Sequence, residues 1–382
     1  MRTLAVGALA LLAGGCLEAH ATRCANGAIC PDGFACTENA ETLCGPELLV
    51  EACMGRDEFA PCEVHVSGEP AVGPGACHAG VCDACTEDFA GCHFAQWTAM
   101  RSPTTENLYT VFAASDSDVD AAGDNGTFLH YDGKAWSRSE SYKQLVGAED
   151  AETIWRDATS ELVLVTKGDI YRKRIDGSWE LAVSTGSTLS AMWAASPTDV
   201  VAAGLAGVIV EYNGTTATPV TPAPIPSFVY RGVWVSSTGQ AWAVGRQGGV
   251  VRRVNGVWSV ARAPMSSQPD LRAVWGRADN DVWMVGDVPA VGATEPTILH
   301  FDGTTIAPAA LPTGTLGPIQ LLGLTGTATD VWAASAGSTI EHYDGTTWTQ
   351  METSAGASLD AISAAHDIFA VGVGGRIYRF TP

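Results

Sequence analysis

The chain has 382 residues, of which 16% are charged, and its formal net charge is −21 with a pI near 4.6. Nucleic-acid binding needs clustered Lys and Arg, so this charge balance argues against a polyanionic partner. The 42 glycines and the lack of long helical periodicity favour all-β structure built from short strands. The length allows two or more domains.

Residues 1–15 are predicted to be an export signal. Arg2 supplies a charged start, and residues 4–13 (LAVGALALLA) form an apolar run that is too short to span a bilayer. The run leads into LLAGGC, so that Cys16 follows small residues. This pattern resembles the lipobox of bacterial lipoproteins, with Ala13 at a position where that family usually has Leu.

The resemblance implies cleavage before Cys16, attachment of palmitate-type acyl chains to that cysteine, and a tether over residues 16–23. In the lipoprotein family a residue other than Asp after the cysteine, here Leu17, implies sorting to the outer membrane of a Gram-negative bacterium, on its periplasmic or surface face. The alternative is an ordinary signal peptide followed by a chance cysteine.

Residues 24–92 hold ten further cysteines, and the remaining 290 residues hold none. An even number of cysteines in an exported segment predicts a disulfide-rich module with about five bridges, whose connectivity stays open. A metal-binding or redox pair at Cys82 and Cys85 is the alternative. The cysteines expected to form disulfides are Cys24, Cys30, Cys36, Cys44, Cys53, Cys62, Cys77, Cys82, Cys85 and Cys92.

From residue 108 onward the chain repeats one pattern, with starts at 108, 151, 189, 230, 271, 321 and 359. The spacing averages about 42 residues, the length of a four-stranded propeller blade. Each unit contains an LxxVW strand, a DVWAVG-like strand, a third strand ending in an Asp-Gly or Asn-Gly pair, and a fourth strand beginning near Trp. The six Asp-Gly and Asn-Gly pairs suit positive φ at both turn positions. The sequence therefore predicts a seven-bladed β-propeller over residues 93–382.

The last repeat reaches Pro382 before any fourth strand. The segment WTAM at residues 97–100 matches WTQM at residues 348–351, where the sixth repeat has its fourth strand. An unpaired edge would be an aggregation hazard. We therefore predict that the stretch from Phe94 to Ser102 supplies the missing strand and closes the ring.

The aromatic residues follow the repeat. All twelve tryptophans occupy three repeat positions, so we interpret them as packing residues and not as sugar-stacking platforms. His130, His300 and His342 share one position before the Asp-Gly turn and are also expected to be structural.

The repeat pattern W-x-x-S-x-x-D-V-W-A-V-G-x-x-G-x-I-x-H-Y-D-G-x-x-W resembles the propeller repeats of secreted bacterial surface lipoproteins. More distantly it resembles photosystem II assembly-factor-like and sialidase (BNR) propellers. The resemblance implies a binding or assembly role. The sialidase Asp-box is not met, because the segment from Asp344 to Trp348 is one residue short and lacks the leading Ser.

Motifs for chemistry are weak. Asp116, Asp118, Asp120 and Asp124 imitate a calcium loop, but Asp118 is the ordinary turn acid of the repeat, and the expected Gly and closing Glu are missing. Nucleophile-elbow, HExxH and P-loop motifs are absent. We expect no catalytic residues, no metal and no cofactor. Candidate arginines exist without a motif that selects one: Arg156, Arg231, Arg246, Arg272 and Arg277.

The favoured function is a membrane-anchored, monomeric binding or scaffold module for an envelope or extracellular protein or glycan. The alternatives are a glycan-acting hydrolase or lyase and an envelope assembly factor. The longest loops, Thr218–Phe228, Asp287–Thr297 and Ala307–Gln320, belong to the propeller face that usually binds ligands. Within the patch on this face the candidate ligand-binding residues are Arg246, Asp287 and Glu295.

Overall fold

The computed structural model of the protein describes residues 97–382, apart from 222, 226, 267, 291–292, 310–319 and 354–355, together with short strands between residues 22 and 84. The side chains of 288–290, 293–296 and 352, and of those short strands, are outside the description. The chain divides into two compact units, Met1–Phe94 and Ala95–Pro382.

The first unit contains paired short strands. The strands β1 (Thr22–Arg23) and β2 (Ile29–Cys30) pair, as do β3 (Phe34–Cys36) and β4 (Cys44–Pro46), while β5 (Pro61–Val66), β6 (Glu69–His78) and β7 (Val81–Ala84) form a three-stranded sheet. Cys36 stands opposite Cys44 in the backbone register, and Cys77 stands opposite Cys82. Cys16, Cys24, Cys53, Cys85 and Cys92 lie outside the described residues, and the disulfides stay a prediction.

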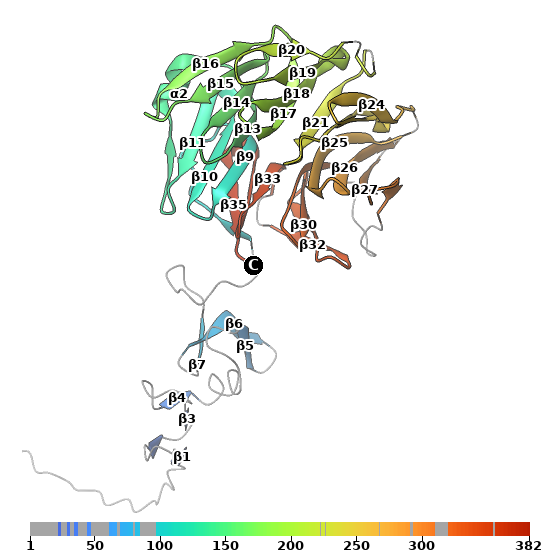
Figure 1. Ribbon diagram of the computed structural model, residues 1–382. Coiled ribbons are helices and arrows are strands. Elements are labelled where there is room, and N and C mark those ends of the chain that lie inside the picture. The colour runs from blue at the N-terminus through green and yellow to red at the C-terminus, as the bar shows by residue number, and fades with distance from the viewer. Residues whose placement is uncertain are drawn as a thin grey trace, which may run out of the picture. The chain divides into compact units, whose positions relative to one another are not determined.

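The second unit is a seven-bladed β-propeller, which confirms the predicted fold (Figure 1). Within residues 97–382 seven four-stranded antiparallel sheets follow one another along the chain. The first three blades are β9 (Leu108–Ser115), β10 (Asp118–Gly123), β11 (Thr127–Tyr131) and β12 (Trp136–Arg138); β13 (Ala151–Arg156), β14 (Glu161–Val165), β15 (Asp169–Lys173) and β16 (Trp179–Ser184); and β17 (Leu189–Ser196), β18 (Asp199–Gly204), β19 (Ile209–Tyr212) and β20 (Ala217–Pro219).

The remaining blades follow the same order. They are β21 (Tyr230–Val235), β22 (Ala241–Gly245), β23 (Val250–Val254) and β24 (Val257–Arg262); β25 (Asp270–Ala278), β26 (Asp281–Ala290), β27 (Ala293–Phe301) and β28 (Ile306–Pro308); β29 (Leu321–Gly326), β30 (Val331–Ser335), β31 (Thr339–Tyr343) and β32 (Trp348–Glu352); and β33 (Leu359–Ala364), β34 (Ile368–Gly372), β35 (Ile377–Phe380) and β8 (Trp97–Ala99). The predicted repeat starts coincide with the first strands of the blades to within one residue.

The ring closes as predicted. Each first strand contacts the first strand of the next blade, and β33 of the last blade contacts β9 of the first. The strand β8 pairs antiparallel with β35, with Trp97 opposite Phe380 and Ala99 opposite Tyr378. The first strands surround the propeller axis (Figure 1). Residues from all seven of them line a central channel.

The tryptophans pack within and between blades, as predicted. Each of the twelve is buried or partly buried. The ring of Trp234 in the fourth blade lies against Gly276 in the fifth, where an added Cβ would come within 2.5 Å of the indole. Trp275 lies in the same way against Gly326 in the sixth blade. The glycines therefore make room for the indole of the preceding blade.

The three repeat histidines are structural, as predicted. His300 and His342 each lie 2.8 Å from the aspartate two residues before the tryptophan of their blade's second strand, Asp281 and Asp330. They stack on Trp283 and Trp332 at ring separations of 4.1 and 3.7 Å. In the first blade Asp120 occupies the place of the tryptophan and bonds to His130 at 2.8 Å. This hydrogen bond raises the pKa of His130.

One detail of the hairpins differs from the prediction. Only Asn255 and Gly256 both have positive φ, at 50° and 77°. At the other five pairs only the glycine does. The Asn255 hairpin has a two-residue loop, whereas longer loops let the first side chain accept backbone N–H groups, as Asp132 does from Lys134 and Ala135 at 2.9 Å.

A helix that the repeat pattern did not predict connects the first two blades. The helix α2 (Glu140–Val146) begins after Ser139, whose hydroxyl accepts the N–H of Tyr142, and ends at Gly147 with φ of 76°. Tyr142 is fully buried against Phe128 and Trp179, which fixes the helix to the outer strands. No helix of the described residues is long and apolar enough to span a bilayer.

Removing the closing indole should destabilise the propeller. Trp97 is 8% exposed and packs against Phe380 and Trp332 at ring separations of 5.4 and 6.2 Å. We expect Trp97→Ala to lower the free energy of unfolding by about 3–5 kcal/mol, measured by urea denaturation. The matched control is Thr98→Ala on the same strand, which is exposed and should change stability by less than about 0.5 kcal/mol. Equal stability of both variants would contradict the closure role.

Candidate functional site: the mouth of the central channel

A β-bulge occurs at the same place in all seven described blades. In each first strand the residue after the leading apolar or aromatic residue, here called the second position, is skipped in the pairing with the second strand. In the fourth blade, for example, Tyr230 pairs with Gly245 and Gly232 pairs with Val244, so that Arg231 has no partner in the strand pairing. The same register shift recurs in the other six. A bulge re-aims a side chain and is common beside functional sites.

In five blades a glycine of the second strand lies opposite the start of this bulge, whereas the second and sixth blades have Val165 and Ser335 there. The backbone just before the first strand passes so close that a Cβ on Gly245 would lie 2.0 Å from the carbonyl oxygen of Val229. The equivalent distance is 1.9 Å for Gly123 and for Gly286. At these glycines a Cβ would collide with the backbone, so the first strand would have to shift. The final Gly of the DVWAVG pattern is thus explained by a close backbone approach.

The bulged residues form one ring of the channel wall. The channel is a cavity of about 290 Å³ lined by the second, third and fourth residues of the seven first strands. The third and fourth positions carry small and apolar side chains, whereas charge is confined to the second position. In blade order the second-position ring is Tyr109, Glu152, Ser190, Arg231, Arg272, Leu322 and Asp360.

The fourth and fifth blades give this ring a basic side. Arg231 makes no hydrogen bond or ion pair with any described residue, and its Nε is buried without a partner. Burial, with the neighbouring charges of Arg272 and Arg246, lowers the pKa of the Arg231 guanidinium. An unpaired, partly buried cation is costly in the free protein. An anionic group of a ligand would relieve that cost.

The opposite side of the ring is acidic. Burial raises the pKa of Glu152, which accepts a hydrogen bond from Thr166 at 2.7 Å. Burial also raises the pKa of Asp360, which accepts from Ser358 at 2.5 Å. Between these two blades Tyr109 has its pKa raised to about 12 by burial and by Asp124.

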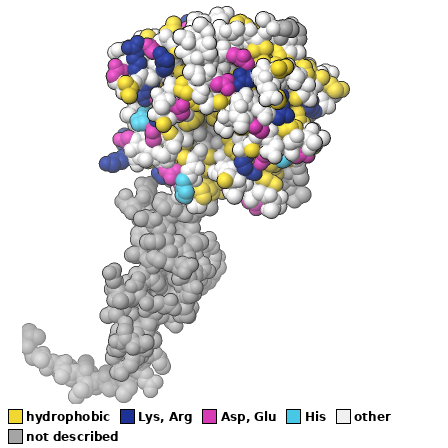
Figure 2. Space-filling view, in the orientation of Figure 1, with side chains coloured by type: hydrophobic (Ala, Val, Ile, Leu, Met, Phe, Trp, Pro, Cys, Tyr) yellow, Lys and Arg dark blue, Asp and Glu magenta, His cyan; other side chains and the backbone are white. Residues whose placement is uncertain are grey.

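The two sides face each other across the axis. In a seven-membered ring the first blade lies opposite the junction of the fourth and fifth, so Tyr109 faces the pair Arg231 and Arg272. Glu152 and Asp360 flank Tyr109 in the second and seventh blades. The ring therefore carries its arginines on one side and its carboxylates on the other. Over the outer surface seen in Figure 2, by contrast, acidic and basic side chains are interspersed.

The residues predicted to bind a ligand occupy different environments. Arg246 lies on the short turn Arg246–Gly248 beyond β22, is 56% exposed, and has its Nε 4.0 Å from Asp270. Asp287 is 2% exposed, and its Oδ1 forms an ion pair with the Nε of Arg272 at 2.6 Å. Asp287 thus positions an arginine of the ring. Glu295 stands opposite Val288 in the backbone register, and its side chain is outside the description. Direct ligand binding by these three stays a prediction.

The four aspartates that imitate a calcium loop do not converge. Asp118 and Asp120 both bind the guanidinium of Arg156, a residue of the second blade. Asp124 instead accepts from Asn107 at 2.8 Å, and Asp116 accepts the N–H of Asp367 at 2.7 Å. The aspartates serve contacts between different parts of the ring.

A larger hollow of about 980 Å³ adjoins the first blade, lined by residues 100–106, 131, 134–136 and 138. Its Arg138 already donates to Thr104 at 2.7 Å. The channel mouth, with an unpartnered guanidinium, is the stronger candidate site. Sequence reasoning named Arg231 and Arg272 but did not single them out. When the seven repeats are aligned, the charged residues of the channel wall all fall at one position, directly after the leading apolar residue.

Comparison with known proteins supports the fold. No family model and no curated protein matched the chain. Among solved structures, YCF48 bound to a D1 peptide is similar with a TM-score of 0.59 and 16% identity, over 76% of this chain and 98% of that one. YCF48 from Cyanidioschyzon merolae has a TM-score of 0.59 and 18% identity, over 75% and 99%.

A third similar structure is the extracellular domain of a protein described as a hybrid two-component system from B. thetaiotaomicron. Its TM-score is 0.58 and its identity 15%, over 75% of this chain and 40% of that one. At these identities the likeness establishes the propeller fold. The propeller fold that the repeat implied is thereby confirmed.

Removing the partner of Arg272 should destabilise the channel wall. We expect Asp287→Ala to lower the free energy of unfolding by about 3 kcal/mol, because it leaves a partly buried guanidinium unpaired. The control is Asp270→Asn, which keeps the Oδ1 that accepts the N–H of Gln247 and should cost less than about 1 kcal/mol. Chemical denaturation measures both. A loss at Asp287 no larger than at Asp270 would show that the pair does not hold the wall together.

Proposed function

We propose that the protein is a non-catalytic binding module that captures an extended segment of a partner protein at the mouth of its propeller channel. An acidic group of the segment faces Arg231 and Arg272. A basic or N–H-bearing group of the same segment faces Glu152 and Asp360. The observation that carries the proposal is the unpartnered guanidinium of Arg231 on the channel wall.

Two further observations support a protein segment as the ligand. A cavity of about 290 Å³ holds only one or two side chains of a ligand, which suits an extended chain better than a folded surface. One of the similar structures is a propeller that holds a D1 peptide, so a propeller of this fold can bind a peptide.

Peptide binding tests the proposal. An array of 15-residue peptides with graded acidic content is screened against the full chain, and the best binder is titrated by fluorescence anisotropy. We expect acidic peptides to bind most tightly and Arg231→Gln to weaken that binding at least tenfold, since a charge-assisted contact is worth roughly 1.5–3 kcal/mol. The dissociation constant should also rise with added salt.

The matched control is Arg174→Gln. Arg174 is 57% exposed on the outer hairpin of the second blade, where it pairs with Glu180. This variant removes the same charge far from the channel and should bind like the parent. If Arg231→Gln binds the acidic peptide as tightly as Arg174→Gln does, the channel mouth is not the site.

We further propose that the module is displayed at a bacterial envelope as a lipoprotein. The support is the sequence LLAGGC, in which small residues precede Cys16 after an apolar run. Acyl chains on this cysteine would hold the protein at a membrane surface, because each buried methylene contributes about 0.8 kcal/mol. An anchored module would meet its partners at that surface.

Substitution of the anchoring cysteine tests this placement. We expect Cys16→Ser to abolish incorporation of labelled palmitate in a Gram-negative host and to move the protein from the membrane fraction to the soluble fraction. Cys24→Ser, eight residues later, is the control and should remain labelled and membrane-bound. Labelling that persists in Cys16→Ser would contradict lipidation at this residue.

A further inference from the structure

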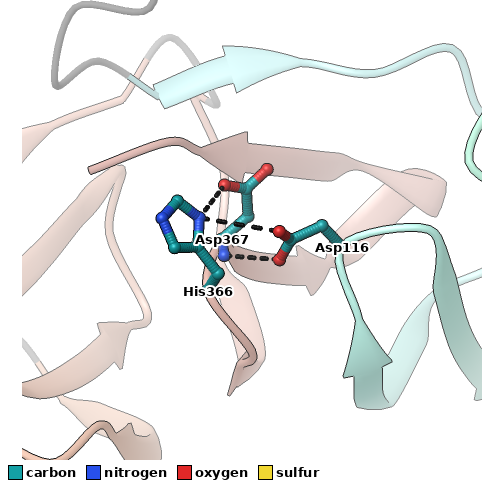
Figure 3. Close-up of side chains that lie close together, drawn as sticks. All are labelled: Asp116, His366 and Asp367. Atoms are coloured by element: carbon teal, nitrogen blue, oxygen red, sulfur yellow. Dashed lines mark hydrogen bonds and ion pairs between the residues drawn. The ribbon is translucent and has the colours of Figure 1, made fainter.

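We propose that Asp116, His366 and Asp367 form a binding site for a divalent transition metal such as Zn²⁺, at the seam where the first and last blades meet. The proposal is independent of the channel and of its ligand. Asp116 follows β9 in the turn before β10, and His366 and Asp367 form the turn between β33 and β34. Figure 3 shows the three side chains converging from these two turns.

The spacing of the three donor atoms suits a metal ion. His366 Nδ1 lies 3.5 Å from Asp116 Oδ2 and 3.2 Å from Asp367 Oδ1, and all three atoms lie within 4.8 Å of one another. Ligands at the usual zinc bond length in tetrahedral geometry stand about 3.4 Å apart. A metal could therefore be accommodated with small side-chain adjustments.

Hydrogen bonding within the group leaves one oxygen unsatisfied. Both carboxylate oxygens approach the same imidazole nitrogen, and a single Nδ1–H can be donated well to only one of them. No other described residue contacts Asp116 Oδ2 or Asp367 Oδ1. The hydrogen bond of His366 Nδ1 goes to Oδ1 of the buried Asp367 at 3.2 Å, which leaves Asp116 Oδ2, at 3.5 Å, as the oxygen without a hydrogen bond from the described residues. A metal would bind both oxygens at once.

The two carboxylates are fixed by their other oxygens. The Oδ2 of Asp367 accepts from the Arg379 guanidinium and from the Thr381 hydroxyl at 3.2 Å. The Oδ1 of Asp116 accepts the backbone N–H of Asp367 at 2.7 Å. Such outer contacts orient metal ligands in proteins. Asp116 Oδ2 and Asp367 Oδ1 are thus held toward the imidazole before any ion binds.

A second group of two aspartates and a histidine in the described chain already has a cation, a guanidinium, between its carboxylates. Asp118, Asp120 and His130 lie equally close together, but there Arg156 contacts both carboxylates. At the seam, Arg379 contacts only the far oxygen of Asp367. Among the described residues, no Lys or Arg contacts both Asp116 and Asp367 in the way that Arg156 contacts both Asp118 and Asp120.

The donor set selects the class of metal. An imidazole nitrogen with two carboxylates suits Zn²⁺, Co²⁺ or Ni²⁺, whereas Ca²⁺ and Mg²⁺ prefer oxygen ligands alone. Because the ligands come from turns about 250 residues apart, only the closed ring assembles them. A metal that binds the closed ring and not the open chain stabilises the closed ring.

Metal titration of the full, oxidised chain tests the proposal. ZnCl₂ is titrated by calorimetry, CoCl₂ by its visible absorption, and the melting temperature is recorded with and without Zn²⁺. We expect the parent to bind one more equivalent of Zn²⁺ than His366→Ala, and its melting temperature to rise with Zn²⁺. His366 is 72% exposed, so this substitution should leave the fold intact.

Two further variants keep the test specific. Asp116→Asn retains the Oδ1 that accepts the Asp367 N–H but should bind Zn²⁺ at the seam at least tenfold more weakly. Glu140→Gln removes one negative charge at an exposed position on α2 and should match the parent. Any Zn²⁺ bound at cysteines would be the same number of equivalents in all variants, so it does not affect the difference between them. The proposal is overturned if parent, His366→Ala and Asp116→Asn bind the same number of equivalents, or if Zn²⁺ leaves the parent's melting temperature unchanged.

Discussion

The pairing of β8 with β35 is the constraint on which the propeller depends. Seven wedge-like sheets can share one axis only if the last blade is complete, because an incomplete blade would expose an unpaired strand edge and the aromatic cluster of Trp97, Trp332 and Phe380. Closure fixes the distance between opposite first strands. The channel, the ring of bulged residues and the seam between Asp116 and Asp367 all exist because the ring is shut.

Much of this architecture was predictable from the sequence, for physical reasons. Repeat length, alternating strands and tryptophan spacing encode blade packing locally, so the seven starts and the closing strand Trp97–Ala99 could be found without coordinates. The helix α2 could not, because its stability comes from burying Tyr142 against Phe128 and Trp179 and not from a long amphipathic pattern. The hairpin conformations depended on loop length, which the Asp-Gly pair alone does not define.

The candidate site was predictable only in part. Arg231 and Arg272 could be named as candidate arginines, yet their meeting on one side of a channel depends on a bulge that re-aims one residue per blade. Asp287 looked like a ligand residue because the sequence places it at the start of a long loop. In the structure it lies within β26, opposite Pro296 of β27, and is buried against Arg272, which the sequence alone does not show. The same holds for Asp116, His366 and Asp367, since no local motif joins residues so distant in sequence.

The closing strand also has a consequence for how the chain folds. The strand β8 is made before the rest of the propeller, and β35, the strand with which it pairs, is made after it, so this contact spans nearly the whole domain. Contacts of such long sequence separation form slowly. During synthesis and any passage across a membrane, the strand that carries Trp97 must stay unpaired until β35 has been made. A chaperone that shields this short strand would raise the yield of the folded protein without touching any completed blade.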